Sequence, residues 1–354
     1  MKYVIYLITW FLSIQLSIAK TPKNIILFIG DGMGPAQITA ARTIKGELQM
    51  DRFKIGGFAL THSFENYVTD SAAGATAMAT GYKSYNGAIS VAPETFQPLK
   101  TILEYAEEKG KKTGLVATST INHATPACFA AHVKKRNLYE DIALDMSKSG
   151  VDVLIGGGRG YFLPKGEPGS KRTDEEKPLE NMQGGTFVYD YATLSKIGQT
   201  DKLIALLELD ELPPALKRTY TLSLLTQKAI ALLSSDKDGF FLMVEGSQID
   251  WGGHDNNKDY LLSEMRDFDE AIGAALDFAE DDGKTLVIVT ADHETGGLSL
   301  MDGSLEEKDV ELKFATGHHT AVMVPVFAYG PGAEAFGGIQ QNTNIGQSMI
   351  NFWK

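Results

Sequence analysis

Acidic and imidazole side chains follow four separate apolar segments of this 354-residue sequence. They and their neighbours are Asp31 after 24–29, Asn122, His123 and Thr125 after 113–117, Glu245 and Asp250 after 240–244, and Asp292 and His293 after 285–290. Carboxylates gathered at one buried place would repel one another strongly unless cations neutralised them. Aspartate and histidine together, without cysteine, suit zinc or a similar divalent ion at a hydrolytic site. Asp250 and His254 are close enough in sequence to share such an ion.

A second candidate for chemistry is the segment Thr69-Asp70-Ser71-Ala72-Ala73, which starts with polar residues and continues in small helix formers. It predicts a helix N-terminus, where free N–H groups can hold a phosphate. Ser71 is a candidate nucleophile there, and metal coordination would have to activate it because no histidine is its sequence neighbour. The alternative is that Ser71 only caps the helix, since serine is a preferred cap.

The elements that must position these residues alternate along the chain. Apolar runs rich in β-branched residues predict buried strands at 24–29, 113–117, 151–155, 240–244, 285–290 and 324–328. Helical patterns lie between them at 99–109, 137–149 and 215–233, and in a long helix that ends near Gly283. This alternation predicts an α/β fold with a mostly parallel central sheet and helices on both faces. Ligands bind outside the carboxyl ends of such strands, so the side chains above should meet at one edge.

Composition and charge limit the class of protein. The formal net charge of −12 disfavours a general nucleic-acid binder, because an acidic chain repels a phosphate backbone. Any anion site must therefore be local, and bound cations could supply its charge. The one cysteine, Cys128, lies in an apolar run, which excludes an internal disulfide and predicts a buried, inert thiol.

Residues 1–19 have the layout of a secretory signal peptide. Lys2 precedes a mostly apolar stretch, and small residues precede an expected cleavage site before Lys20. This predicts a periplasmic or secreted protein; an uncleaved membrane anchor is the alternative. No later stretch is long and apolar enough to span a bilayer. Residues 20–354 are interpreted as one domain, with a surface excursion at about 156–199 that is rich in Gly, Pro, Lys and Glu.

Six short strings resemble the alkaline phosphatase family and occur in the family's order. They are FIGDGMG at 28–34, TDSAA at 69–73, HATPA at 123–127, VEG at 244–246, TADHE at 290–294 and HT at 319–320. The likeness extends from about Lys23 to Phe336, and six separated motifs in order are highly specific. The resemblance implies an alkaline-phosphatase-like fold and a phosphate-monoester hydrolase that acts on small-molecule phosphomonoesters through a phosphoserine intermediate.

The resemblance also implies roles by position. Ser71 matches the nucleophile, and Arg136 matches the arginine that binds two phosphoryl oxygens through its planar fork. The implied cofactors are two Zn²⁺ and one Mg²⁺. Their implied ligands are Asp250, His254 and His319 for the first zinc, Asp31, Asp292 and His293 for the second, and Asp31, Thr125 and Glu245 for magnesium. The family is commonly dimeric, so a homodimer is a further expectation, although no stretch identifies an interface.

Two candidate substrate-binding positions depart from the best-known bacterial members of the family. Those members have aspartate and lysine where this chain has His123 and Trp251. The His/Trp pair resembles some marine and cold-habitat bacterial members. Without the lysine, one water-mediated contact to phosphate is missing, and we expect weaker phosphate binding. His123 is interpreted as a residue that contacts the metal ligands but does not itself bind the metal.

Several alternatives stay open. His318 could replace His319, and Asp70 could orient Arg136 or cap the Ser71 helix. A phosphodiesterase of the same superfamily is mildly disfavoured, because diesterases often carry threonine as nucleophile. A sulfatase is disfavoured because the Cys/Ser-x-Pro-x-Arg string is missing at Ser71. A secreted metal- or phosphate-binding protein without turnover would have lost a site residue, and none is lost. The excursion's aromatic residues could line a substrate entrance or pack within the loop; they are Tyr161, Phe162, Tyr189 and Tyr191.

Overall fold

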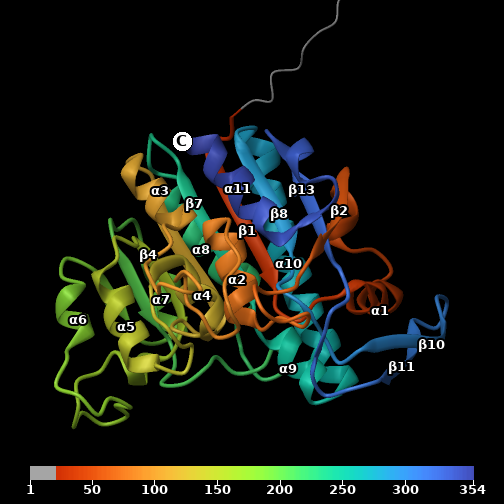
Figure 1. The fold of residues 1–354 in the computed structure, drawn as a ribbon, viewed down its shortest axis with the longest axis horizontal. Coiled ribbons are helices and arrows are strands. Elements are labelled where there is room, and N and C mark those ends of the chain that lie inside the picture. The colour runs from red at the N-terminus through yellow and green to blue at the C-terminus, as the bar shows by residue number, and fades with distance from the viewer. Residues whose placement is uncertain (1–20) are drawn as a thin grey trace, which may run out of the picture.

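A ten-stranded sheet runs through the molecule in the order β14-β2-β13-β8-β1-β7-β3-β4-β6-β5 (Figure 1). The computed structural model describes residues 21–354, so the signal peptide expected at 1–19 lies outside the described residues. The strands are β1 (Asn24–Gly30), β2 (Ile55–Leu60), β3 (Lys112–Thr120), β4 (Val153–Gly157), β5 (Thr186–Val188), β6 (Leu203–Leu206), β7 (Phe240–Gly246), β8 (Thr285–Thr290), β13 (Val324–Tyr329) and β14 (Gly338–Gln341). Neighbouring strands are parallel except at β13, which is antiparallel to β2 and β8. The predicted mostly parallel α/β fold is confirmed.

Helices cover both faces of this sheet. On one face lie α8 (Leu222–Leu233) and α10 (Lys258–Asp282); on the other lie α2 (Ser71–Thr80), α3 (Ile102–Glu108), α4 (Ala124–Ala130) and α11 (Asn342–Trp353). The two sides are visible in β3, where successive residues point to opposite faces. A Cβ on Gly114 would meet Leu233 of α8, whereas Thr113 hydrogen-bonds to Glu107 of α3. Because both faces are covered, β1, β7 and β8 are buried along their whole length and read as continuous apolar runs.

The remaining elements lie around this layered core. They are α1 (Pro35–Lys45), α5 (Tyr139–Lys148), α6 (Pro178–Asn181), α7 (Tyr191–Lys196), α9 (Gln248–His254), β9 (Glu294–Thr295), β10 (Leu298–Ser304), β11 (Asp309–Phe314) and β12 (His319–Thr320). β10 and β11 form a hairpin that projects from the molecule (Figure 1). Within residues 21–354, no helix has the length and apolar character needed to cross a membrane.

The segment at 156–199 is more than a surface loop. It contributes β5, which pairs with β6 and forms one edge of the central sheet. It also buries Phe162 and Leu194. Tyr191 stacks on Tyr220, with ring centroids 4.7 Å apart. This segment therefore extends the core at the side where α5 and α6 lie (Figure 1).

Candidate active site

Four adjacent parallel strands, β8, β1, β7 and β3, end at one edge of the sheet. Their carboxyl ends carry the acidic and imidazole residues that the sequence singles out. Three groups of these residues have potential ligand atoms within 4.8 Å of one another. The groups are Asp250, His254 and His319; Asp31, Asp292 and His293; and Asp31, His123 and Glu245. The structure thus brings together, within one group, residues that lie up to 262 positions apart, from Asp31 to His293.

The first group consists of a carboxylate between two imidazoles. Asp250 lies 3.3 Å from His254 Nε2 through Oδ2 and 3.5 Å from His319 Nε2 through Oδ1. His254 Nδ1 is 2.8 Å from the carbonyl oxygen of Gly317, and His319 Nδ1 is 3.0 Å from that of Thr69. A carbonyl can only accept, so each Nδ1 carries the hydrogen and each Nε2 lone pair is free to bind a cation. His318 is exposed and lies outside all three groups.

Asp31 belongs to both other groups. His293 Nε2 lies 3.4 Å from Asp31 Oδ1 and 3.3 Å from Asp292 Oδ2, and all three residues are fully buried. Thr125, at the start of α4, is also fully buried, but it is not a member of a His/Asp/Glu group because its donor is a hydroxyl.

The donor atoms of this edge fit bound cations. Several buried oxygens have no hydrogen-bond partner among residues 21–354: both carboxylate oxygens of Asp31, Oγ1 of Thr125, Oε1 of Glu245 and Oδ2 of Asp292. Buried polar atoms normally find partners, and an unpaired buried carboxylate costs much free energy. The set of oxygens and imidazoles without sulfur matches zinc and magnesium.

The raised pKa values of the buried carboxyl groups also indicate that this edge of the sheet needs positive charge. Burial, together with the neighbouring carboxylates of Asp292, Asp250 and Glu245, raises the pKa of Asp31 well above its ordinary value. Burial raises the pKa of Glu245 to about 7 and that of Asp292 to about 6. A divalent cation would reverse these shifts by stabilising the ionised carboxylates.

Ser71 is the first residue of α2, and its side chain is buried. Its Oγ lies 3.3 Å from His293 Nε2, so the hydroxyl faces the second group. The cap of this helix is Asp70, whose Oδ1 accepts a hydrogen bond from Ala73 N at 3.0 Å. Ser71 is therefore not the cap. All ten residues of α2 are buried, and a Cβ on Gly74 would lie 2.9 Å from Asp292 Cβ, which explains why this helix needs small side chains.

Arg136 is held beside this serine by two contacts. Its Nη1 donates to Asp70 Oδ2 at 3.0 Å, and its Nη2 lies 3.4 Å from His123 Nε2. Burial and the nearby guanidinium lower the pKa of His123 to about 3, so this imidazole stays neutral. The ring of Trp251 packs edge-on against His123, with centroids 6.3 Å apart. His123 and Trp251 thus form a wall next to the guanidinium.

Sequence reasoning missed residues that hold the groups in place. Thr295 Oγ1 donates to Asp250 Oδ1 at 2.5 Å and lies 3.2 Å from His293 Nδ1, so it joins the first and second groups. Ser119 Oγ donates to Glu245 Oε2 at 3.3 Å and accepts from Ser247 Oγ. Small hydroxyl residues are common in any sequence, and the only signal for Thr295 is its place directly after the TADHE string.

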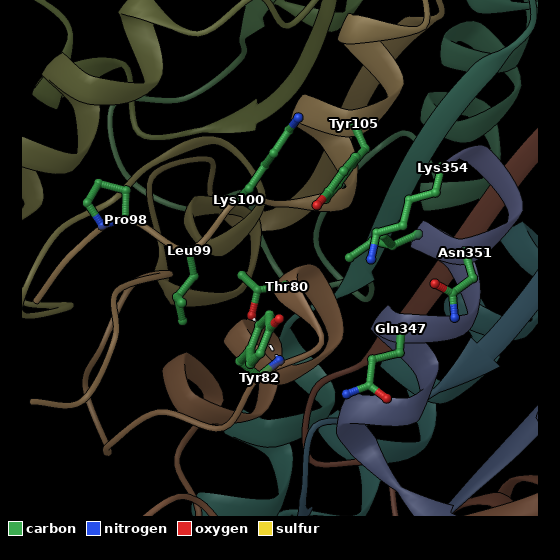
Figure 2. A pocket seen from close by; sticks show the side chains of 10 residues that line it. Thr80, Tyr82, Pro98, Leu99, Lys100, Tyr105, Gln347, Asn351 and Lys354 are labelled. Carbon is green, nitrogen blue, oxygen red and sulfur yellow. Dashed lines mark hydrogen bonds between the residues drawn. The ribbon is translucent and has the colours of Figure 1, made fainter. Parts of the chain in front are cut away.

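Cavity size alone would not have found this edge. A cavity of about 510 Å³ lies between the C-terminal end of α2, the start of α3 and the helix α11 (Figure 2). Its labelled side chains include Tyr82, Lys100, Tyr105 and Lys354, and it contains none of the candidate ligands. A smaller cavity of about 290 Å³ adjoins the site at His123 and Trp251.

Comparison with known proteins identifies the family. The model of the family described as alkaline phosphatase matches residues 22–316. The chain belongs to the alkaline phosphatase family. It is 36% identical to alkaline phosphatase 3 of Bacillus subtilis, over 93% of this chain and 88% of that protein.

Solved structures agree with this assignment. The alkaline phosphatase of the Antarctic bacterium TAB5 is 44% identical, with a TM-score of 0.88 over 95% of this chain and all of that one. A variant of the same enzyme, with glutamate in place of a histidine, is described with Mg bound in its M3 site; it is 43% identical, with a TM-score of 0.86 over 95% of this chain and 99% of that one. The present alkaline phosphatase is a phosphomonoester hydrolase.

Proposed function

We propose that this alkaline phosphatase cleaves phosphate monoesters in two displacements, with Ser71 as nucleophile and a phosphoserine as intermediate. The observation that carries the proposal is the placement of the Ser71 hydroxyl. It is buried at the first turn of α2, 3.3 Å from His293, and the helix cap Asp70 also holds Arg136. The hydroxyl of Ser71, the guanidinium of Arg136 and the candidate metal ligands therefore lie close together.

The chain's own residues bind and orient the phosphoryl group. Free N–H groups at the start of α2 and the planar fork of Arg136 would hold its oxygens. Asp70 fixes the orientation of the fork. Ser71 Oγ attacks phosphorus, the ester P–O bond breaks, and the alcohol leaves with the proton that the serine hydroxyl gives up. Water then attacks the phosphoserine, the bond from phosphorus to Ser71 Oγ breaks, and phosphate leaves with the Ser71 hydroxyl restored. Two in-line displacements each invert configuration, so retention at phosphorus is expected.

The metal assignment is also a proposal. Asp250, His254 and His319 would hold one zinc, and Asp31, Asp292 and His293 a second. Asp31 and Glu245, which form a group with His123, would hold a magnesium together with the unpaired hydroxyl of Thr125. When bound, these ions supply positive charge for the entering and leaving oxygens and lower the pKa of water. Thr295 and Ser119 orient the ligands through the hydrogen bonds described above.

The direct test is hydrolysis of p-nitrophenyl phosphate near pH 9 by the purified mature chain. Activity should require zinc and magnesium, disappear on chelation and return when both are restored. The Ser71→Ala variant should lose activity by roughly three orders of magnitude or more. An active Ser71→Ala variant would exclude the phosphoserine; a metal-loaded wild type that cleaves only bis-p-nitrophenyl phosphate would favour the phosphodiesterase alternative.

Export and self-association are further parts of this proposal. The N-terminal layout supports a cleaved signal peptide and a periplasmic or secreted enzyme. Exposed apolar side chains on β2 and β14, namely Phe58, Leu60 and Ile339, support a homodimer. N-terminal sequencing of the exported protein and light scattering of the purified chain test these two statements.

A further inference from the structure

The cavity beside the active site has aromatic walls and an acidic rim. Its volume is about 290 Å³, and the lining includes His123, Tyr139, Tyr161, Lys171, Asp210, Glu211 and Trp251. It starts at the His123–Trp251 wall, against which Arg136 lies. Trp251 directly follows Asp250, a member of the first candidate metal group. A phosphate monoester held by Arg136 and Ser71 therefore has this cavity as a neighbour for its organic part.

The tyrosine wall is pre-formed. The rings of Tyr139 and Tyr161 stack with centroids 5.1 Å apart and an interplanar angle of 23°. Arg172, which is only 4% exposed, donates to the carbonyl oxygens of Tyr161 at 2.9 Å and of Glu140 at 3.0 Å. This guanidinium ties the excursion to the start of α5. The ring pair therefore needs little reorganisation before it receives a ligand.

The rim of the cavity is also fixed in place and carries net negative charge. Gly158 N donates to the carbonyl oxygen of Asp210 at 2.7 Å, which joins the excursion to the segment that carries the rim. Lys171 pairs with Asp210, but among residues 21–354 no cation forms an ion pair with Glu211. One carboxylate therefore remains uncompensated at the mouth.

We propose that this cavity is a leaving-group subsite that selects phosphate esters of single-ring aromatic alcohols over esters of small alkyl alcohols. Within the aromatic esters, it favours a cationic substituent over an anionic one. The proposal rests on the proposed function, because it places the phosphoryl group at Ser71 and Arg136. A flat ring stacks or packs edge-on against tyrosine and tryptophan, and the volume accommodates one ring rather than a large ligand. The carboxylate of Glu211 attracts an ammonium group and repels a second carboxylate.

The first experiment compares kcat/KM for phenyl phosphate and ethyl phosphate in wild type, Tyr161→Ala and Tyr161→Phe. The ratio of variant to wild type for each ester cancels its intrinsic reactivity. Tyr161→Ala should lose roughly three- to tenfold on phenyl phosphate and less than about twofold on ethyl phosphate, and Tyr161→Phe should restore the aromatic preference. Tyr189→Ala is the matched control, because Tyr189 lies in the same segment but outside the cavity. Equal losses on both esters, or none, would overturn the proposal.

The second experiment tests the charge of the rim. Wild type should prefer 4-(aminomethyl)phenyl phosphate to 4-carboxyphenyl phosphate, and Glu211→Gln should reduce that preference relative to wild type. An unchanged preference would show that Glu211 does not contribute to the selectivity of the subsite.

A binding measurement separates the subsite from turnover. Phenylphosphonate, which is not hydrolysed, should change the fluorescence of Trp251 at lower concentration than methylphosphonate, and Tyr161→Ala should abolish the difference. Trp353, the other tryptophan after residue 20, is buried in α11. If the metal-loaded wild type hydrolyses neither ester, the proposed function fails. If it hydrolyses both and Tyr161 has no selective effect on turnover or binding, only the subsite fails.

Discussion

The carboxylate of Asp70 holds Arg136 and the helix of Ser71 at the same time. Its Oδ2 accepts from Arg136 Nη1 at 3.0 Å, while its Oδ1 accepts from Ala73 N at 3.0 Å and from Gly87 N at 3.1 Å. The two interpretations offered by the sequence, orientation of the arginine and capping of the helix, are therefore both correct. One side chain therefore contacts both Arg136 and the helix of Ser71, the proposed phosphate-binding group and the proposed nucleophile.

Two substitutions at Asp70 should separate these tasks. Asparagine is an equally good cap, so Asp70→Asn should keep the free energy of unfolding near wild type while weakening phosphate binding through loss of the charge pair with Arg136. Asp70→Ala should weaken phosphate binding and also cost about 1 kcal/mol. Urea unfolding and phosphate inhibition measure the two effects. Asp190→Ala, which removes the cap of α7, is the control and should change stability alone. Normal phosphate inhibition in Asp70→Asn would show that Arg136 needs no orientation.

Removal of metal should destabilise the fold as well as stop catalysis. Chelation leaves Asp31, Glu245 and Asp292 buried together without a compensating charge. An ion present at a thousand times its Kd stabilises the folded state by about 4 kcal/mol, so Tm should fall by several degrees on chelation and recover with zinc and magnesium. Ser71→Ala should show the same metal-linked change in Tm, because Ser71 is outside the three groups. A Tm insensitive to chelation would contradict the assignment of metal to this edge.

Thr295 should be needed for metal retention, although it is not a ligand in any group. Its hydroxyl joins Asp250 to His293, and substitution of such orienting partners typically costs about 10- to 100-fold in metal affinity. Thr295→Val keeps the shape and removes the hydroxyl, whereas Thr295→Ser keeps the hydroxyl. Zinc retention measured against a competing chelator should fall in the valine variant and be preserved in the serine variant. Equal retention in both would assign Thr295 a packing role only.

Trp251→Lys should strengthen inhibition by phosphate. Position 251 lies at the wall next to His123 and Arg136, so an ammonium group there adds positive charge close to the anion. The inhibition constant for phosphate should fall several-fold. Trp251→Met controls for loss of the ring and should not strengthen inhibition. An inhibition constant that is the same in the lysine and methionine variants would show that the charge does not reach the phosphate.

The pH dependence of stability should carry a contribution from Glu264. Burial raises the pKa of Glu264 to about 7, despite the nearby Arg218, whereas the unfolded chain titrates at the ordinary value of 4.5. The folded state therefore binds more protons between these values, and its stability falls as the pH rises from about 4.5 to about 7. Glu264→Gln removes the titrating group, so urea unfolding of the metal-saturated protein at several pH values should show a flatter slope in this window. An unchanged slope in Glu264→Gln would show that Glu264 does not contribute to this pH dependence.

Much of this edge could be predicted from sequence because Asp31, Glu245 and Asp292 each lie at or just after the carboxyl end of a buried parallel strand. Apolar runs locate β1, β3, β7 and β8, and a parallel sheet brings their carboxyl ends together without further information. The apolar pattern does not reveal β2, because its sequence IGGFAL contains two glycines and only one of its six residues, Ala59, is buried. β14 was missed for a similar reason: it is a short edge strand with a mostly exposed surface.

Contacts that depend on long-range packing were beyond the sequence. The sequence favours none of the four aromatic residues of the excursion as part of a substrate entrance. In the structure, only Tyr161 of these four lines the cavity next to His123 and Trp251. Phe162 is buried, Tyr191 stacks on Tyr220, and Tyr189 lies against Arg159. Nothing in composition distinguishes these four positions. The packing of this segment against α5 and the segment at 208–211 makes the difference.

The close packing of the small side chains of α2 limits which residues of this enzyme can change during evolution. Gly74 lies against Asp292, Thr76 touches Cys128, and Gly346 of α11 packs on the carbonyl oxygen of Met78. A random-mutagenesis library screened for activity should therefore be depleted of variants along the whole helix, and not at Ser71 alone. Relatives that evolve specificity for another leaving group are expected to change the excursion and the rim near Glu211, where new side chains have room, while the helix that begins at Ser71 stays the same.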